Sequence, residues 1–315
     1  MSAAGFLFLA PGKHTVSRSI GEDRLMESFF ENIVTSAALG SIYALISIGM
    51  TMVYGLLKIL HVAHASVYVL GAFAGLYAYR ISGSYALAFF SAAVFCAVMG
   101  YLMYNFAYRK VQNEKPLVPL IVSIGLFTAL SDVYRLLAGP YSIAFKAPFE
   151  GKHFAIGNFH MTYSQILVIG CAVGLLTLVW FVVNRTTTGL AWRASSQDRE
   201  VSIGIGVNAN AYFGLNFMFG SALAGVAGVL VSIYYGAVNA NMGEVWAYKV
   251  FVVMVLGGLG NVTGTVVASY LLAVAETFIV ANWGYFLPRD AIAFICMIVM
   301  LIIMPSGVLG RRQEA

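Results

Sequence analysis

Charged residues are scarce in this chain. Asp, Glu, Lys and Arg make up 10% of the 315 residues, hydrophobic residues make up 60%, and the mean hydropathy is +0.84. Soluble globular domains carry about 25% charged residues, so the composition excludes a soluble domain and predicts a polytopic membrane protein. The 18 basic residues outnumber the 13 acidic ones. In a membrane protein this excess is expected in cytoplasmic loops, and it does not indicate a nucleic-acid partner.

Cysteine is nearly absent as well. Cys96, Cys171 and Cys296 all lie inside apolar segments, and their spacing is not that of a metal site. We therefore predict three small buried hydrophobic side chains and no metal centre.

Catalytic motifs are missing too. The sequence contains no Gly-x-x-x-x-Gly-Lys-Ser/Thr phosphate loop, no His-Glu-x-x-His zinc motif and no Gly-x-Ser-x-Gly nucleophile turn. We expect neither an enzyme activity nor a cofactor in this chain. If ATP powers transport, partner subunits must bind it.

What the sequence does contain is a series of long apolar windows. A helix that crosses about 30 Å of hydrocarbon needs about 20 residues, and eight windows are candidates, with an error of one or two. They are residues 33–57, 62–79, 81–108, 117–137, 166–183, 211–235, 250–281 and 291–304. The predicted fold class is therefore all-α, a multi-pass bundle in the lipid bilayer.

The seventh window is about half as long again as one span. It is interrupted by Gly257-Gly258-Leu259-Gly260-Asn261. Two interpretations are open: one kinked helix, or a half-helix near 250–262 that turns back before a full helix.

Basic residues predict the orientation. By parity, residues 109–115, residues 185–199 and the Arg311-Arg312 pair fall on one side, which is expected to be cytoplasmic. The same count places the N-terminus outside, although residues 1–25 carry three basic residues. Either residues 1–25 are a disordered extension or an upstream start, or a re-entrant piece near His61 changes the parity.

The opposite side has one sizeable loop, residues 139–164. Its stretch 153–163 is aromatic and partly alternating in polarity, a pattern typical of a small β-hairpin. An ordinary connector is the alternative.

The most polar run between two apolar blocks is residues 189–208. Ser195 followed by Asp198 fits a capping box, which predicts a short helix over residues 196–203. Gly204 and Gly206 offer the left-handed conformation that ends a helix. A capped helix between spans suits the docking of a soluble partner, and a solvated linker is the alternative.

Ionisable residues inside the windows are functional candidates, because burying them in lipid is costly. Glu276 is such a candidate, with a helix-pinning role as the alternative. Asp132 and Arg135 are predicted to pair as i,i+3 neighbours. Lys249 is predicted to extend its ammonium group toward the lipid headgroups.

His61 and His64 begin the second window, three residues apart on one helix face. Two histidines are a weak metal signal without a third ligand. They either line a transport path or lie at the membrane interface. Farther along, residues 220–228 carry Gly and Ala at three- and four-residue spacing, which predicts close helix packing.

Longer motifs carry a family resemblance. They are GSIYALISIGMTMVYG at 40–55, ALAGVAGVL at 222–230, VLGGLG at 255–260, MPSGVLGR at 304–311, and Arg193-Ala194 with Asp198 and Gly206. On these motifs the chain resembles the permease subunits of branched-chain amino acid ABC importers, specifically the H-type partner of the paired permeases. The resemblance covers residues 26–312, which would form one transmembrane permease domain.

The resemblance implies a coupling loop. In that family the loop matching residues 189–208 engages the ATPase subunits, so the ATPase-coupling candidates are Arg193, Asp198, Arg199, Glu200 and Gly206. The implied partners are two cytoplasmic ATPases, a second related permease and a periplasmic solute-binding protein. The implied location is the bacterial inner membrane, and the implied substrate is a small amino acid.

The chain departs from the family pattern near the expected path. The family usually reads Asn-Phe-Ala-His-Gly followed by Asp or Glu, whereas this chain has HVAHAS at 61–66, and a usual glycine is Ala268. The path candidates are His61, His64, Ser66 and Glu276. Urea and other amino acids stay open as substrates. A self-contained secondary transporter or channel is the rival class, favoured by the intramembrane His and Glu, and a membrane-embedded enzyme is a more distant one.

Overall fold

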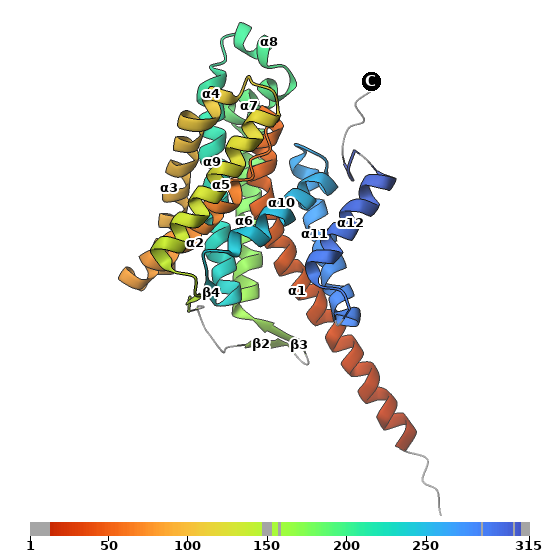
Figure 1. Cartoon of the computed structure of the whole chain (residues 1–315). Coiled ribbons are helices and arrows are strands. Elements are labelled where there is room, and N and C mark those ends of the chain that lie inside the picture. Colours follow the sequence, from red (N-terminus) through yellow and green to blue (C-terminus); the bar gives the residue numbers. More distant parts are fainter. Residues whose placement is uncertain (1–12, 147–152, 157–158, 285, 305, 310–315) are drawn as a thin grey trace, which may run out of the picture.

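The computed structural model describes residues 13–146, 153–156, 159–284, 286–304 and 306–309, and the side chains of residues 13–25, 153, 155, 156, 159 and 160 are outside the description. The predicted all-α bundle is confirmed (Figure 1). Its helices are α1 (Lys13–Leu57), α2 (His64–Ser82), α3 (Tyr85–Met103), the π-helix η1 (Tyr104–Tyr108), α4 (Arg109–Val111), α5 (Leu117–Ala138), α6 (Tyr163–Arg185), α7 (Thr187–Gln197), α8 (Arg199–Gly204), α9 (Ala209–Tyr235), α10 (Met242–Gly257), α11 (Val262–Trp283) and α12 (Arg289–Ile303).

Six helices of the described part are long and apolar enough to cross a membrane. They are Met26–Leu57 of α1, the continuous stretch Tyr85–Val111, and α5, α6, α9 and α11. The other two predicted windows hold α2 and α12, so the predicted count agrees within its stated error. The expected extension over residues 1–25 stays a prediction, because residues 1–12 lie outside the description.

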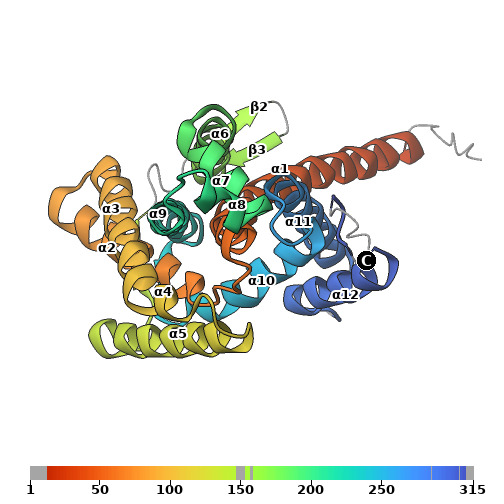
Figure 2. The same ribbon diagram turned by 90° about the horizontal axis from the view of Figure 1, so that it is seen from above.

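Small residues hold the centre of the bundle together. A Cβ atom at Gly71 of α2 would collide with the backbone of Gly225 of α9, and one at Gly228 would collide with the carbonyl of Tyr68. The close packing predicted for residues 220–228 is therefore confirmed. In the apolar window of α9, 72% of the residues are buried, against 17% in that of α6. Viewed from above, α9 lies inside and α3, α5 and α6 lie at the rim, while the N-terminal part of α1 projects beyond the bundle (Figure 2).

The chain folds back into the bundle between α1 and α2. Lys58 has a φ of +57°, in the left-handed region, and reverses the direction of the chain after Leu57. The His64 ring then reaches the carbonyl of Ile46 at 3.0 Å. Leu57 lies eleven positions after Ile46 along α1, or about 16 Å at 1.5 Å per residue. Helix α2 therefore starts well inside the bundle.

The glycine-broken window is two helices. Helix α10 ends at Gly257. The next glycines, Gly258 and Gly260, have positive φ. The Asn261 side chain then accepts a hydrogen bond from the Gly264 amide and so caps α11. Residues 257 and 264 touch, and so do 249 and 276, so the helices run antiparallel. The single kinked helix is excluded, and the short α10 (16 residues) turns back into the full α11.

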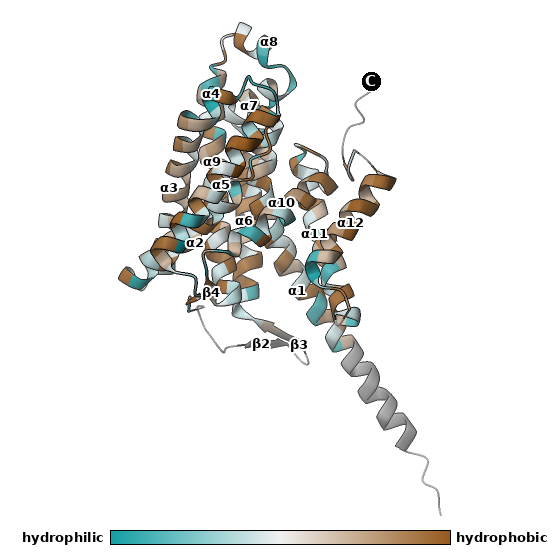
Figure 3. Ribbon diagram, in the orientation of Figure 1, coloured by the Kyte–Doolittle hydropathy of each residue, from teal (hydrophilic) through white to brown (hydrophobic). Residues whose placement is uncertain are grey.

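The loop after α5 forms the predicted hairpin. Strand β2 (His153–Ile156) pairs antiparallel with β3 (Phe159–Thr162), and β1 (Ile143–Ala144) pairs with β4 (Ala237–Val238). The hairpin lies at one end of the bundle and α8 at the other, here named the hairpin end and the α8 end (Figure 1). Hydrophilic residues gather at the α8 end, over α4 and α8 (Figure 3).

Candidate functional site

Two helices, α7 and α8, make the polar tip of the α8 end, where one helix was expected. Helix α7 starts after the Thr186 cap, and Ser195 is buried inside it. Asp198 accepts a hydrogen bond from the Val201 amide at 2.9 Å and so caps α8. The predicted capping box of Ser195 with Asp198 is therefore wrong, because the helix begins nine residues earlier and Asp198 starts the next one.

Gly206 ends this tip as predicted. It has a φ of +94°, and its amide donates to the Ile203 carbonyl. Gly204 is the last residue of α8 and has no positive φ. Of the two glycines expected to adopt the left-handed conformation, only Gly206 has a positive φ.

The five coupling candidates lie together on the tip but differ in exposure. Arg193, Asp198, Glu200 and Gly206 are exposed. Arg199 donates to the Asn113 side chain at 3.0 Å and lies 5.2 Å from the centre of the Phe213 ring. Arg199 thus ties α8 to the loop before α5 and to α9.

Exposed apolar side chains on the same tip escaped the sequence prediction. Val201, Ile203 and Ile205 are 59%, 50% and 73% exposed. These three apolar residues recur at every second position within a polar run, and this pattern is the sequence signal that could have identified them. A mixture of charge and exposed apolar area at a solvated tip suits contact with another protein.

A second polar group lies where α2 begins. His61 Nδ1 is 2.7 Å from the Tyr108 hydroxyl, and the His61 and His64 rings are 5.6 Å apart. Ser66 donates to the Phe127 carbonyl at 3.1 Å. All three candidates are buried, so His61 and His64 lie inside the bundle and not at its surface. Tyr108 belongs to η1, and π-helical turns are often found at functional sites.

Glu276 belongs to a different cluster. It is fully buried, accepts a hydrogen bond from the Tyr43 hydroxyl, and pairs with Lys249 Nζ at 3.1 Å. Lys249 also lies 3.6 Å from Asp290. The predicted extension of Lys249 to the headgroups is therefore wrong, because the buried carboxylate supplies the counter-charge inside. The pair joins α10 to α11.

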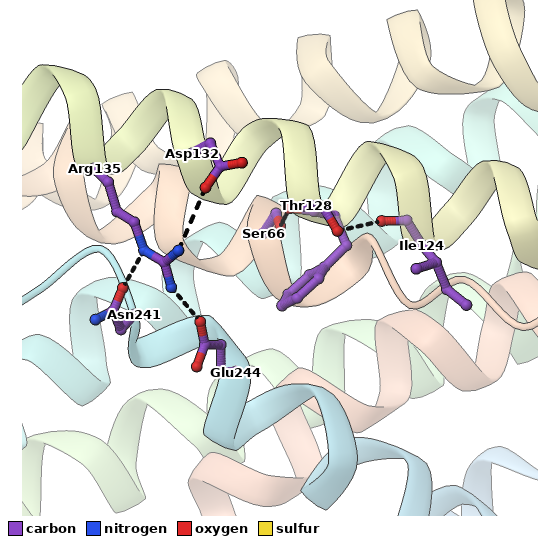
Figure 4. Close-up of polar contacts among 8 residues, drawn as sticks. Ser66, Ile124, Thr128, Asp132, Arg135, Asn241 and Glu244 are labelled. Carbon is purple, nitrogen blue, oxygen red and sulfur yellow. Dashed lines mark hydrogen bonds and ion pairs between the residues drawn. The ribbon is translucent and has the colours of Figure 1, made fainter.

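The predicted pair on α5 is confirmed, and it is part of a larger set. Arg135 lies 3.4 Å from Asp132, and it also contacts Glu244 and donates to Asn241 at 2.6 Å. In Figure 4 the guanidinium bridges α5 and α10. The charged side chains are 42% to 57% exposed, so solvent screens them.

The family described as "Branched-chain amino acid transport system / permease component" matches residues 32–304. The chain belongs to this family. The resemblance seen in the sequence motifs is thereby confirmed, and with it the role of a transport permease.

Relatives cover nearly the whole chain. Permease proteins of high-affinity branched-chain amino acid transport systems, LivH of Escherichia coli and BraD of Pseudomonas aeruginosa, are each 31% identical over 90% of this chain, and the matches cover 96% and 97% of their own lengths. The Escherichia coli permease LivM is 26% identical over 77% of this chain and 62% of its own. The chain is therefore similar to two different permease proteins of the same organism.

Proposed function

We propose that this permease passes a branched-chain or similar small amino acid across the bacterial inner membrane, as a subunit of an ABC importer. Its relatives LivH and BraD are named for branched-chain amino acid transport. In the proposed complex two cytoplasmic ATPases hydrolyse ATP, a second permease of the LivM kind pairs with this chain, and a periplasmic binding protein delivers the substrate.

The observation that carries this proposal is the α7–α8 tip. A solvated helix pair with exposed charges and apolar side chains gives an ATPase a surface to push against, and Trp192 anchors it by donating to the Tyr212 carbonyl at 2.9 Å. The α8 end would thus be cytoplasmic, as the basic loops also favour. The hairpin end would face the binding protein.

The path is proposed to run beside the inner start of α2. There His61, His64 and Ser66 bring polar side chains deep into the bundle, an arrangement that broken helices provide in other transporters. Because His61 is covered by Tyr108 and Phe217, opening the path requires α2 to move relative to η1 and α9. Glu276 would act apart from this group, holding helices together.

An uptake assay tests the proposed substrate. The complete importer in proteoliposomes, with ATP on the ATPase side, should accumulate radiolabelled L-leucine and L-valine only when its binding protein is present. Unlabelled isoleucine should compete and urea should not. Competition by urea alone, or uptake without ATP, would refute the proposal in favour of an amide permease or a secondary transporter.

A further inference from the structure

A cavity of about 170 Å³ lies under the tip, between α7 and the ends of the neighbouring helices. Its walls come from the end of α1, the end of α6, the first half of α9 and the start of α11. We propose that this cavity binds an α-amino acid with an aliphatic side chain on the cytoplasmic side, and that the bound ligand inhibits transport. The identity of the ligand rests on the proposed function.

The polar wall is cationic. Lys58 and Arg193 both line the cavity and both are exposed at its solvent side. Neither forms an ion pair within the described residues, and no carboxylate lines the cavity. Two cations without a counter-charge favour an anionic group such as a carboxylate.

The lining also holds an unpartnered hydrogen-bond acceptor. Asn216 is 1% exposed, its Nδ2 donates to the Met52 carbonyl at 3.3 Å, and its Oδ1 has no hydrogen-bond partner. A buried polar atom without a partner is rare and costly. An ammonium group has three N–H donors for this oxygen, whereas inorganic phosphate presents mainly acceptor oxygens and a negative charge. The combination of cations and an acceptor therefore selects a zwitterion over a simple anion.

The remaining wall is apolar. Met52, Leu56, Val183 and Val262 line it together with Trp192. An enclosed apolar cavity of about 150 Å³ is large enough for benzene, so this one has room for a leucine or valine side chain. The carboxylate of the ligand would lie near Lys58 and Arg193 and its ammonium group near Asn216 Oδ1, with the aliphatic side chain against this apolar wall.

A ligand at this place would bridge the tip and the bundle. Trp192, Arg193 and Ser196 belong to α7, whereas the other lining residues belong to α1, α6, α9 and α11 and to the loops that follow α1 and precede α11. A ligand that contacts both α7 and these helices would hold α7 in one position relative to them. In the proposed function, α7 has to transmit the movement of the ATPases to these helices. Accumulated product would thereby slow its own import.

The test measures inhibition from the product side. Proteoliposomes holding the complete importer are loaded with ATP and increasing L-leucine on the ATPase side, and initial uptake of labelled leucine is measured. Internal leucine should inhibit the wild type, and Lys58→Asn should raise the half-inhibiting concentration about tenfold, the size of one lost charged hydrogen bond. Asparagine is chosen because it tolerates the left-handed conformation of this position.

The controls separate charge, shape and ligand class. Lys115→Asn removes an exposed lysine outside the cavity and should behave as the wild type. Val262→Phe fills the cavity without changing charge and should abolish inhibition. With an empty lumen, Lys58→Asn should transport at the wild-type rate, and internal phosphate should not inhibit.

Three results would overturn the inference. They are uptake that ignores internal leucine, inhibition that both cavity variants retain, and inhibition by phosphate with the same dependence on Lys58. Normal leucine uptake without an internal effect would refute this site alone. If the wild type takes up no leucine, the proposed function fails. The cavity site is then tested by binding of labelled leucine to the purified importer without its binding protein. Binding that depends on Lys58 supports the site, and absence of binding refutes it.

Discussion

Lys249 and Glu276 face each other with side chains only 6% and 0% exposed, whereas Arg193 and Glu200 at the α7–α8 tip are open to solvent. The buried pair has its partners inside the chain and connects α10 with α11. The tip charges have few partners in the chain and stabilise little of it. The buried charges of Lys249 and Glu276 thus serve the fold, whereas the exposed charges of Arg193 and Glu200 are available to a partner.

Breaking the buried pair should have the largest effect on stability. Glu276→Gln leaves Lys249 charged and without its full counter-charge, which should cost about 3–5 kcal/mol. The thermal midpoint of the detergent-purified chain should fall steeply. Adding Lys249→Met should recover much of the loss, since no buried charge then remains. Single and double variants that are equally unstable would contradict the ion-pair account.

Substitution of His61 tests whether the buried polar side chains at the start of α2 also take part in transport. A protonated His61 would carry a positive charge into the proposed path, so uptake should fall several-fold once the medium is acidic enough to protonate this buried ring. His61→Asn cannot protonate and should flatten this dependence while keeping transport near neutral pH. Initial rates at saturating ATP measure both profiles, and identical profiles would remove His61 from the path.

The hairpin tests the other end of the molecule. Replacing residues 153–163 by a Gly-Ser linker should lower uptake, because the binding protein would lose a docking surface. The ATPases should still co-purify with the permease. Wild-type uptake kinetics in this variant would show that the hairpin is only a connector.

Arg135 should give the smallest effect. Its ion pairs are half exposed, and such pairs contribute about 0–1 kcal/mol each. Arg135→Gln should therefore lower the thermal midpoint far less than Glu276→Gln does. A drop of equal size would contradict the distinction between buried and exposed charge.

Much of the fold follows from local sequence. Apolar windows mark the helices, Gly258 and Gly260 mark the break before α11, and Asp132 with Arg135 pair as neighbours on one helix. The errors concern partners distant in sequence. Lys249 finds Glu276 27 residues away, and Tyr43 reaches the same carboxylate from α1. The sequence predicts Asp198 in the first turn of a helix capped by Ser195, whereas Asp198 is itself the cap of α8, because propensity and spacing do not reveal that α7 extends from Thr187.

One double variant tests whether the α7–α8 tip couples the permease to the ATPases. Arg193→Glu combined with Asp198→Asn changes the charge of the tip while asparagine keeps the α8 cap. In the reconstituted importer, ATP hydrolysis stimulated by the loaded binding protein should fall at least about tenfold, with the thermal midpoint unchanged; Lys115→Asn is the control. Unchanged stimulation in the double variant would contradict the assignment of this tip to the ATPases.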